Sequence, residues 1–504
     1  MIDKLNEIFA PAADAVAKVN SVLTDYVLLF LLIGIGLFYT IRTRFVQVRC
    51  FGKGMKLVFG NLSLKGGKQK GGLSSFQALA TAIAAQVGTG NIVGACGAIL
   101  LGGPGAIFWM WVIAFLGMAT IYAEAVLAQK TRVVNEDGSV SGGPVYYIKH
   151  AFKGKFGKGL AAFFAVAAML ALGFMGSMVQ SNSIGEAVGN AVGMEAGTYQ
   201  WIIGLVVAAL AAVIFIGGVN RIASVTEKLV PLMAMLYIVG SLIVIGSRIT
   251  YIPATFGMIF KYAFTGDALI GGGIGYALKM ALSQGAKRGL FSNEAGMGST
   301  PHAHAQANVK DPHEQGCTAM IGVFIDTFIV LTMTALVVIS TLYAGGGELG
   351  DASKYIWKDG VEGGTRIVPG YEKTTLAQMA FGSIFWGETF GSIFVAVCLF
   401  FFAFSTILGW NFFGKINAEY LFGKKGGKIY TVVAVLFVFA GSLFSNGFVW
   451  ELTDFFNYLM VLPNVLVLAL LSTMVVKSAC RKKDDKKEEC ELPADAPSTP
   501  SEEE

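Results

Sequence analysis

A stretch of 53 residues without Asp, Glu, Lys or Arg runs from Gly71 to Ala123. A membrane span takes about 20 residues of apolar helix, so a stretch of this length predicts a membrane-embedded segment. Its middle carries Gly88-Thr89-Gly90-Asn91, and glycine costs about 1 kcal/mol relative to alanine inside a helix. A helix interrupted at mid-membrane is tolerated only where its free backbone groups line a cavity or bind a ligand. The stretch therefore predicts a binding site built from a broken helix.

The composition is that of a polytopic membrane protein. Of the 504 residues, 54% are hydrophobic and 14% are charged, whereas soluble domains carry about 25% charged residues. Basic cytoplasmic loops account for the net charge of +5 without a nucleic-acid partner. The chain has no GxxxxGK[ST] motif, which argues against an ATP-driven machine. Its six cysteines form no CxxC pair, so neither a disulfide framework nor a zinc site is suggested, and no cofactor is expected.

Apolar windows of about 17–25 residues predict roughly eleven membrane spans. The expected spans are 26–41, 75–99, 105–128, 159–190, 201–218, 229–247, 268–288, 316–343, 387–410, 429–446 and 450–476. The loop from Arg42 to Gly72 has eight Lys or Arg and no acid. By the positive-inside rule this loop lies in the cytoplasm, which places the amino terminus outside and the carboxyl terminus inside the plasma membrane.

The spans after the first fall into two sets of five. We expect an extracellular lead-in (1–25), an extra amino-terminal helix (26–41), a first repeat (75–247), a second repeat (268–476) and a disordered cytoplasmic tail (477–504). The first span of each set is interrupted, one at Gly88 and the other near Gly289 to Ser292. Interruptions at corresponding places in two halves indicate an inverted-repeat transporter with its site at the membrane midplane.

The first interruption offers two kinds of ligand. Carbonyls from Ala84 to Val87 lose their helical partners at the negative end of a helix dipole, where they suit a small hard cation. The N–H groups of Thr89, Gly90 and Asn91 begin the next half-helix and suit a carboxylate. Adjacent cation and anion sites fit a zwitterionic amino acid with sodium. A glycine hinge or a helix-packing face from Gly90 to Gly94 is the open alternative.

Polar side chains in later spans are further candidates. The adjacent hydroxyls of Ser405 and Thr406 either bond to carbonyls of their own helix or complete a sodium site. Trp410 shares the face of Thr406 and either closes the site or anchors its helix. The amide of Gln180 either joins helices or contacts substrate.

Ionisable residues within or beside spans are functional candidates by default. They are Glu124, Lys279, Glu294 and Asp326, of which Asp326 is the deepest. We interpret Asp326 as an ion-pair or gating partner or as a cation ligand. His302 and His304 are two residues apart and face different sides of a helix, so a metal site there is not expected.

Three blocks make the chain resemble the alanine or glycine:cation symporter family of sodium:alanine symporters, within the amino acid–polyamine–organocation superfamily. The blocks are Gly88-Thr89-Gly90-Asn91-Ile92 with Gly102-Gly103-Pro104-Gly105-Ala106-Ile107-Phe108-Trp109-Met110-Trp111, Lys287-Arg288-Gly289-Leu290-Phe291-Ser292-Asn293-Glu294-Ala295-Gly296, and Ser405-Thr406-Ile407-Leu408-Gly409-Trp410. The resemblance covers most of the chain outside the charged tail. It implies an all-α polytopic membrane protein with a LeuT-like 5+5 inverted repeat and one extra amino-terminal helix.

The resemblance also implies roles for single residues. The substrate would contact the N–H groups of Thr89 and Gly90 beside Asn91, with Gln180, Phe291 and Trp410 lining and closing the pocket. Sodium would be held by the carbonyls of Ala84, Val87 and Phe402 with the hydroxyls of Ser405 and Thr406. Gln86, Ser292, Asp326 and Glu294 are candidates for a second ion or for gating.

The function expected from these residues is secondary symport, without enzymatic activity. A small neutral amino acid, alanine or glycine, would be imported with sodium by alternating access. Proton coupling, or another small solute on the same fold, is the alternative. A channel is a further alternative, and an intramembrane hydrolase is disfavoured because no Ser-Lys, Ser-His or HExxH arrangement lies within a span.

Overall fold

A computed structural model describes residues 2–60, 73–136, 139–193, 199–265, 273–357, 366–385 and 387–480. The charged tail from Arg481 onward, expected to be disordered, lies outside the described residues. The same holds for residues 61–72 of the basic loop and for 268–272 at the start of the expected second repeat.

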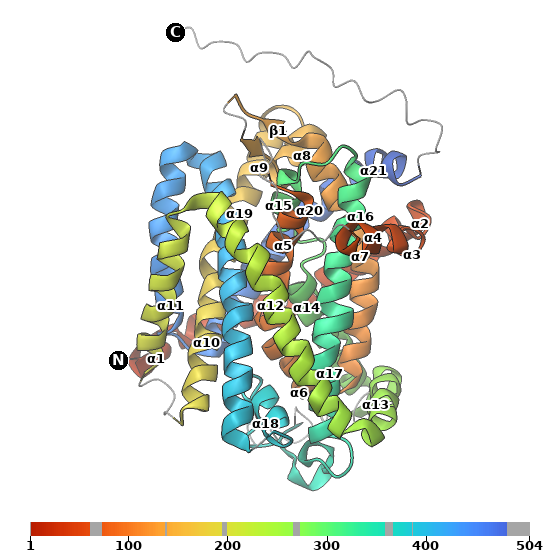
Figure 1. Ribbon diagram of the computed structural model, residues 1–504, viewed down its shortest axis with the longest axis vertical. Helices are drawn as coiled ribbons and strands as arrows, with labels where there is room; N and C mark the ends of the chain where they lie inside the picture. Colours follow the sequence, from red (N-terminus) through yellow and green to blue (C-terminus); the bar gives the residue numbers. More distant parts are fainter. Residues whose placement is uncertain are drawn as a thin grey trace.

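The described chain is almost entirely helical (Figure 1). Its first part comprises α1 (Ile2–Val22), η1 (Leu23–Leu28), α2 (Leu29–Arg42), α3 (Val46–Arg49), α4 (Phe51–Phe59), α5 (Ser75–Gln86), η2 (Gly90–Gly94), α6 (Ala95–Gly102), α7 (Gly105–Thr131), α8 (Pro144–Ala151), α9 (Gly154–Ala168), η3 (Met169–Gly176), α10 (Ser177–Ala191), α11 (Gln200–Phe215) and α12 (Gly218–Ser247). The second part comprises η4 (Ile249–Tyr251), α13 (Ile252–Thr265), α14 (Gly273–Asn293), α15 (Pro301–Gln306), α16 (Pro312–Val323), η6 (Phe324–Leu331), α17 (Thr332–Leu342), η7 (Glu348–Gly350), η8 (Ala352–Lys354), α18 (Leu376–Gly382), α19 (Glu388–Gly441), α20 (Asn446–Leu470) and α21 (Ser472–Ala479). The η segments are π-helical or 3-10-helical turns.

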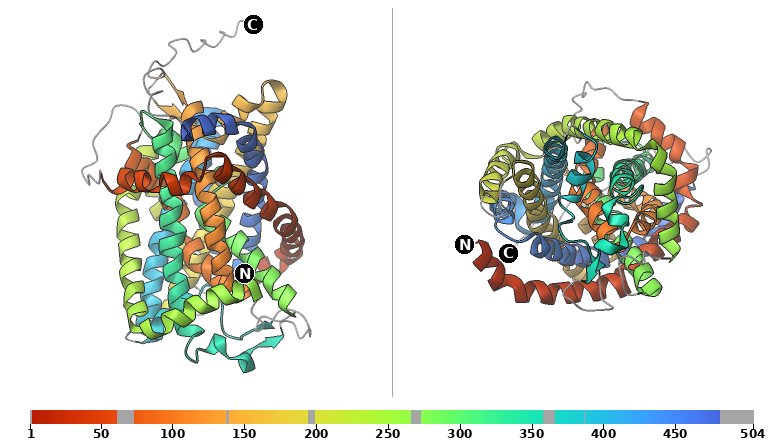
Figure 2. Two further views of the ribbon diagram at one scale, coloured as in Figure 1. Left: turned by 90° about the vertical axis from the view of Figure 1, so that its right-hand side faces the viewer. Right: turned by 90° about the horizontal axis from the view of Figure 1, so that it is seen from below.

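Two short antiparallel hairpins complete the described elements. β1 (Val133–Val134) pairs with β2 (Val140–Ser141), and β3 (Ile356–Trp357) pairs with β4 (Arg366–Ile367). The two hairpins lie at opposite ends of the helical bundle (Figures 1 and 2).

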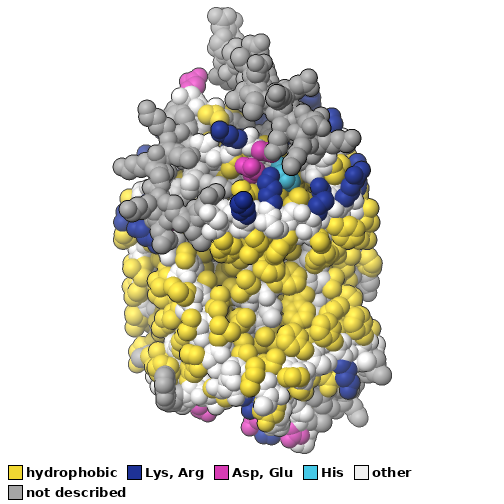
Figure 3. Space-filling view, turned by 45° about the vertical axis from the view of Figure 1, so that its right-hand side comes forward, with side chains coloured by type: hydrophobic (Ala, Val, Ile, Leu, Met, Phe, Trp, Pro, Cys, Tyr) yellow, Lys and Arg dark blue, Asp and Glu magenta, His cyan; other side chains and the backbone are white. Residues whose placement is uncertain are grey.

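Among the described residues, six helical segments are long and apolar enough to cross a membrane. They are α7, α9–η3–α10, α12, α16–η6–α17, α19 and α20. The pair of α5 and η2–α6 makes a seventh span with a bend of 46°. On the face shown in Figure 3, hydrophobic side chains cover the middle of the molecule, and Lys and Arg side chains gather toward one end. The protein is therefore a multi-pass membrane protein.

Helix α19 shows how the span boundaries differ from the sequence-based expectation. Its 54 residues would extend about 80 Å if straight, which exceeds the thickness of a membrane. The helix instead turns at Gly423, whose φ is 69°. The two parts overlap the expected spans 387–410 and 429–446, but the helix ends at Gly441, five residues before the expected end of the second span. The count of roughly eleven spans stays a prediction.

Two helices were not expected as such, and a third, α12, is longer than the span expected at 229–247. The lead-in is the helix α1, which continues through η1 into α2 along the outside of the bundle (Figure 2). Helix α13, to which no span had been assigned, packs against α7 and α14. Helix α12 begins at Gly218, well before the apolar window that starts at residue 229. Polar residues at a helix end can continue the helix outside the hydrocarbon, so hydropathy places a span more accurately than it places helix ends.

The two interrupted segments, one that begins with α5 and one that comprises α14 and α15, are hydrogen-bonded to each other at one end. Helix α5 packs against α12, α16 and α19, whereas α14 packs against α6 and α7. The Leu73 N–H donates to the Gln306 carbonyl at 2.9 Å, and the Asn308 N–H donates to the Leu73 carbonyl at 2.9 Å. The start of α5 is therefore paired with the end of α15, and both belong to interrupted segments.

Candidate functional site

The first interruption lies between α5 and η2. Helix α5 starts with a capping box of Ser74 and Gln77 and ends at Gln86. Val87 then leaves the helical region, with φ −80° and ψ 89°. Gly88 lies in the gap, where an added Cβ would be 2.3 Å from Thr406 Oγ1. Since no larger residue fits this approach, glycine is required for contact between the break and α19.

Four oxygen atoms converge on the α5 side of the break. Thr406 Oγ1 lies 3.0 Å from the Ala84 carbonyl oxygen and 3.1 Å from the Phe402 carbonyl oxygen. Ser405 Oγ lies 3.3 Å and 2.8 Å from the same two oxygens. These four residues are buried. An all-oxygen set at the carbonyl end of a helix suits a small hard cation.

Val87 is the remaining residue of the expected sodium set. It is buried at the end of α5, and its N–H donates to the Ile83 carbonyl at 2.7 Å. Its position at the end of the helix leaves its carbonyl outside the α5 hydrogen-bond ladder. The structure thus brings Ala84, Phe402, Ser405 and Thr406 into contact and places Val87 next to them along the chain.

The amide end of the break meets Gln180 of α10. The Thr89 N–H donates to Gln180 Oε1 at 3.2 Å. Gly90 is packed against α14, with an added Cβ only 3.0 Å from Ser292 Cα and 3.1 Å from Phe291 Cδ1. Thr89, Gly90, Gln180 and Phe291 therefore lie around one point. The Thr89 N–H already has an acceptor there, so a ligand carboxylate would take the place of the Gln180 oxygen.

Asn91 has a different environment from its neighbours. Its backbone N–H donates to the Gly88 carbonyl, and its Oδ1 accepts from the Gly88 N–H at 3.0 Å. Its Nδ2 donates to Asp326 Oδ1 at 2.6 Å. The Asn91 side chain thus stabilises the break and contacts Asp326, and its expected role in substrate binding stays a prediction.

Aromatic side chains cover the break. The rings of Phe291 and Trp410 meet edge to face with centroids 5.8 Å apart. Phe291 also contacts Trp450, with centroids 4.6 Å apart. Trp410 Nε1 donates to Glu294 Oε1 at 2.5 Å, which fixes the orientation of the indole. These three rings, from α14, α19 and α20, close the site from one side.

The second interruption lies after Asn293, at residues 294–300. Gly289 and Ser292 are inside α14, so the prediction of a helix break at these two residues is wrong. Gly289 fits against α7, where an added Cβ would be 3.5 Å from Met110 and Ile113 atoms, and a close helix contact explains this glycine without a break. The chain turns instead at Glu294, Gly296 and Gly298, which have φ values of 58°, 89° and 80°.

Glu124 of α7 holds this second break. Its Oε2 accepts from the Gly296 N–H at 3.1 Å, and its Oε1 accepts from the Gly298 N–H at 2.9 Å. Asn464 donates to the same carboxylate at 2.7 Å. A buried carboxylate with three donors fixes the backbone where the helix stops.

Asp326 connects the first break to α14. It accepts from Ser292 Oγ at 3.0 Å, from Thr327 Oγ1 at 2.7 Å and from Asn91 Nδ2. The Gln86 amide donates to the Asn293 carbonyl at 2.8 Å nearby. Asp326 is fully buried, and the ion pairs found among the described residues do not include it. Burial of an unpaired carboxylate is costly, so this group suits a bound cation or a proton.

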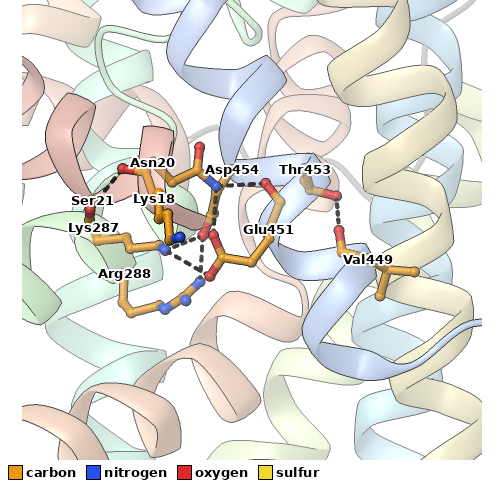
Figure 4. A network of polar contacts seen from close by, with 9 residues as sticks. All are labelled: Lys18, Asn20, Ser21, Lys287, Arg288, Val449, Glu451, Thr453 and Asp454. Carbon is orange, nitrogen blue, oxygen red and sulfur yellow. Dashed lines mark hydrogen bonds and ion pairs between the residues drawn. The ribbon is translucent and has the colours of Figure 1, made fainter. Parts of the chain in front are cut away.

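A cluster of charged side chains joins α14 to α20 (Figure 4). Lys287 Nζ lies 2.8 Å from Asp454 Oδ2 and 3.6 Å from Glu451 Oε1. Arg288 lies 3.4 Å from Asp454 and 4.6 Å from the centre of the Trp450 ring. Asn20 of α1 donates to Glu451 Oε2 at 2.6 Å. This cluster, named here the α14–α20 charge cluster, shares Trp450 with the aromatic cover of the break.

A family model described as the sodium:alanine symporter family matches residues 10–495. The chain belongs to this family. The symporter is 39% identical over 462 residues to the sodium/alanine symporter AgcS of Methanococcus maripaludis, covering 92% of this chain and 95% of that protein. It is 40% identical to YrbD of Bacillus subtilis, whose name describes a sodium/proton-dependent alanine carrier, with 91% and 90% of the two chains covered. The protein is accordingly a transporter and not an enzyme.

The symporter also resembles a solved transporter in fold. The crystal structure of MhsT in complex with L-phenylalanine matches with a TM-score of 0.59 and 14% identity, covering 82% of this chain and 94% of MhsT. The expected LeuT-like helical fold is therefore confirmed at the level of the overall architecture.

Several residues that shape the site of the symporter were not assigned a role from the sequence. Asp454 and Glu451 of the α14–α20 charge cluster are three residues apart on an apolar helix. This spacing was the feature of the sequence that could have pointed to the cluster. Glu124 was noted as an ionisable residue in a span, but its contact with the second break could not be inferred. Trp450 carried no signal that separates it from a packing residue.

Proposed function

We propose that this protein imports a small neutral amino acid, alanine or glycine, together with sodium by alternating access. The observation that carries the proposal is the break at Gly88. Carbonyl and hydroxyl oxygens meet on its α5 side, and N–H groups begin on its η2 side. One interruption therefore offers adjacent positions to a cation and to the carboxylate of an amino acid.

Sodium is the proposed coupling ion because carbonyl and hydroxyl oxygens meet on the α5 side, and the sulfur of Met233, 3.3 Å from Ser405 Oγ, is a poor ligand for a hard cation. The proposed ligands are the carbonyls of Ala84, Val87 and Phe402 and the hydroxyls of Ser405 and Thr406. One sodium entering through about 100 mV gains about 2.3 kcal/mol, and a tenfold gradient adds about 1.4 kcal/mol. This sum sustains roughly a 500-fold accumulation of a neutral amino acid at a one-to-one ratio.

The proposed orientation has the amino terminus outside and the carboxyl terminus inside the plasma membrane, with two five-helix repeats after α2. The gathering of Lys and Arg at one end of the molecule supports this orientation (Figure 3). The α14–α20 charge cluster then lies on the outer side of the break and acts as an outer gate.

Uptake of radiolabelled alanine into proteoliposomes tests the proposal. We expect accumulation that requires an inward sodium gradient and is competed by glycine more strongly than by large neutral amino acids. Flux that is independent of sodium and insensitive to counter-transport would indicate a channel and would contradict the proposal.

Proton coupling is a second candidate, favoured by the buried and unpaired carboxylate of Asp326. Uptake in sodium-free buffer with an imposed pH gradient distinguishes the two ions. Accumulation that persists under this condition, and that is lost in Asp326→Asn, would assign the coupling to protons.

Substitution of Phe291 or Gln180 by alanine is expected to weaken alanine binding more than sodium binding. Phe291 covers the break, and Gln180 contacts the Thr89 N–H, so both lie on the proposed substrate side. We expect a rise of about tenfold or more in the alanine concentration for half-maximal uptake, equivalent to about 1.4 kcal/mol. Phe400→Ala is a matched control, because Phe400 is a partly buried phenylalanine that stacks on Phe404 of the same helix and is not among the proposed ligands. Unaltered alanine affinity in both variants would contradict the proposed placement of the substrate next to Phe291 and Gln180.

Substitution of Asp454 by asparagine is expected to slow uptake by about tenfold or more. The change removes the buried carboxylate shared by Lys287 and Arg288 and leaves Lys287 with the partly exposed Glu451, and loss of one partner of a buried ion pair typically costs about 3–5 kcal/mol. Sodium binding measured on the purified protein should change little. Glu348→Gln is the control, since the Glu348–Lys354 pair is exposed and such pairs contribute little. Equal uptake rates in the two variants would contradict the role of the cluster as a gate.

A further inference from the structure

Two cysteines and a histidine that are far apart in the sequence meet where α4 contacts α16. Cys50 precedes α4, whereas His313 and Cys317 lie one turn apart on α16. Their ligand atoms, one from each residue, all lie within 4.8 Å of one another. Cys50 and Cys317 are buried, and His313 is half-buried. These residues are outside the proposed transport site.

The spacing of these atoms is close to that of a zinc centre. Tetrahedral zinc, with Zn–S of about 2.3 Å and Zn–N of about 2.0 Å, holds sulfur and nitrogen about 3.6 Å apart. Cys317 Sγ lies 3.6 Å from His313 Nε2. The three ligand atoms can therefore bind one ion with small side-chain adjustments.

The histidine has the second contact that a metal ligand needs. His313 Nδ1 lies 2.7 Å from the hydroxyl of Tyr122 on α7. A metal-bound histidine usually donates its other ring N–H to a neighbouring acceptor, which fixes the ring and its tautomer. With Nδ1–H donating to Tyr122, Nε2 is the ring nitrogen left for an ion. Cys317 Sγ lies 3.6 Å from Nε2 and 3.9 Å from Nδ1, beside the ring, so a turn of the ring is needed to point the Nε2 lone pair at an ion next to Cys317.

The candidate ligand atoms are two thiol sulfurs and one imidazole nitrogen. Thiolate is the form that binds metal. Two sulfurs and one imidazole nitrogen are soft and borderline ligands, which select zinc over sodium, calcium or magnesium.

The α4–α16 contact is fixed by other interactions as well. Lys53 Nζ lies 3.9 Å from Glu314 Oε1, and the Phe51 ring meets the Phe324 ring edge to face at 4.8 Å. Cys50 at the start of α4 and the two ligands on α16 are thus held close together before any ion binds, which reduces the cost of assembling a site.

We propose that Cys50, His313 and Cys317 form a zinc site with a fourth position open to water. The bound ion would connect α4 to α16, the helix that continues through η6 to Asp326. Three protein ligands with an open position are a known arrangement for zinc, so the site needs no further protein ligand.

Zinc titration of the reduced, purified full-length protein tests this site. We expect one equivalent of bound zinc in competition with a chromophoric chelator, and a rise in the unfolding temperature on zinc addition. Cobalt in place of zinc should give the near-ultraviolet thiolate charge-transfer band and the strong visible bands of a four-coordinate ion.

Variants of the ligands and of an unrelated cysteine separate this site from other thiols. Cys50→Ser and Cys317→Ser should each weaken zinc binding about 100-fold and remove the cobalt band, since loss of a ligand-shell residue costs at least 10- to 100-fold in metal affinity. Cys480→Ser is the matched control and should bind zinc as the unchanged protein does, because Cys480 is a partly exposed thiol outside the cluster.

Two results would overturn the zinc site. One is unchanged zinc affinity in both Cys50→Ser and Cys317→Ser, provided that their unfolding temperatures without zinc match that of the unchanged protein. The other is a Cys50–Cys317 disulfide that persists in the protein purified under reducing conditions. Neither result bears on sodium-coupled uptake, so failure of this inference is distinct from failure of the proposed function.

Discussion

Replacement of Thr406 by alanine is expected to raise the sodium concentration for half-maximal uptake about tenfold or more. The Thr406 hydroxyl lies within 3.1 Å of the carbonyl oxygens of both Ala84 and Phe402, so it belongs to the proposed ion shell. Removal of one oxygen from a small shell weakens cation binding, and a tenfold change corresponds to about 1.4 kcal/mol. Initial rates of alanine uptake into proteoliposomes over a series of sodium concentrations measure the effect.

Two further variants control this measurement. Thr406→Ser keeps the hydroxyl and should retain most of the sodium affinity. Thr431→Ala removes a threonine of the same helix whose hydroxyl donates to the Gly427 carbonyl, and it should leave sodium dependence unchanged. Normal sodium dependence in a well-folded Thr406→Ala protein would remove the assignment of the ion site.

Replacement of Gly88 by alanine is expected to have a larger effect, with loss of nearly all uptake. The added Cβ would be 2.3 Å from Thr406 Oγ1 and 3.3 Å from Gln180 Oε1. Gly88 therefore separates the proposed sodium and substrate sides, and one methyl group disturbs both. Overpacking typically costs about 1–3 kcal/mol, which corresponds to roughly 10- to 100-fold in affinity for each ligand.

Gly94→Ala in the same span is the matched control for Gly88→Ala. An alanine Cβ at Gly94 meets its nearest neighbour, the Thr89 carbonyl oxygen, at an ordinary 3.8 Å. We expect this variant to transport at close to the normal rate. Thermal unfolding of both purified variants shows whether each is folded. Substantial uptake by Gly88→Ala would contradict the placement of both ligands at the break.

The first interruption could be predicted because its signal is local. Gly88, Thr89 and Gly90 stand in a charge-free segment, and glycine at mid-membrane weakens a helix whatever surrounds it. The second interruption could not be located in this way. Gly289 was expected to interrupt its helix as Gly88 does, but it is accommodated in α14 by packing on α7. The chain turns where Glu124 binds the N–H groups of Gly296 and Gly298.

For Ser405 and Asp326, too, the sequence suggested candidate roles and the tertiary structure showed the contacts. Adjacent hydroxyls in an apolar helix fit both self-bonding and ion binding, and the structure has both contacts, since Ser405 Oγ is near the Phe402 and Ala84 carbonyls. Asp326 was expected to be an ion-pair or gating partner, a cation ligand or part of a second ion site. Its side-chain hydrogen-bond partners are Asn91, Ser292 and Thr327, all neutral, so a second ion or a proton stays a proposal for this carboxylate.

The sequence alone determined that this chain is a helical, multi-pass membrane transporter of the sodium:alanine symporter family and that Gly88 lies at a break. These properties depend on hydropathy, loop charge and short motifs, which are local along the chain. The tertiary structure decided which groups face Gly88, where the second break lies, and that Asp454 pairs with Lys287. It also brought Cys50 to His313 and Cys317, although the cysteine spacing had suggested no zinc site. Such contacts join residues as far apart as Ala84 and Ser405, which are separated by 321 positions, and only helix packing brings them together.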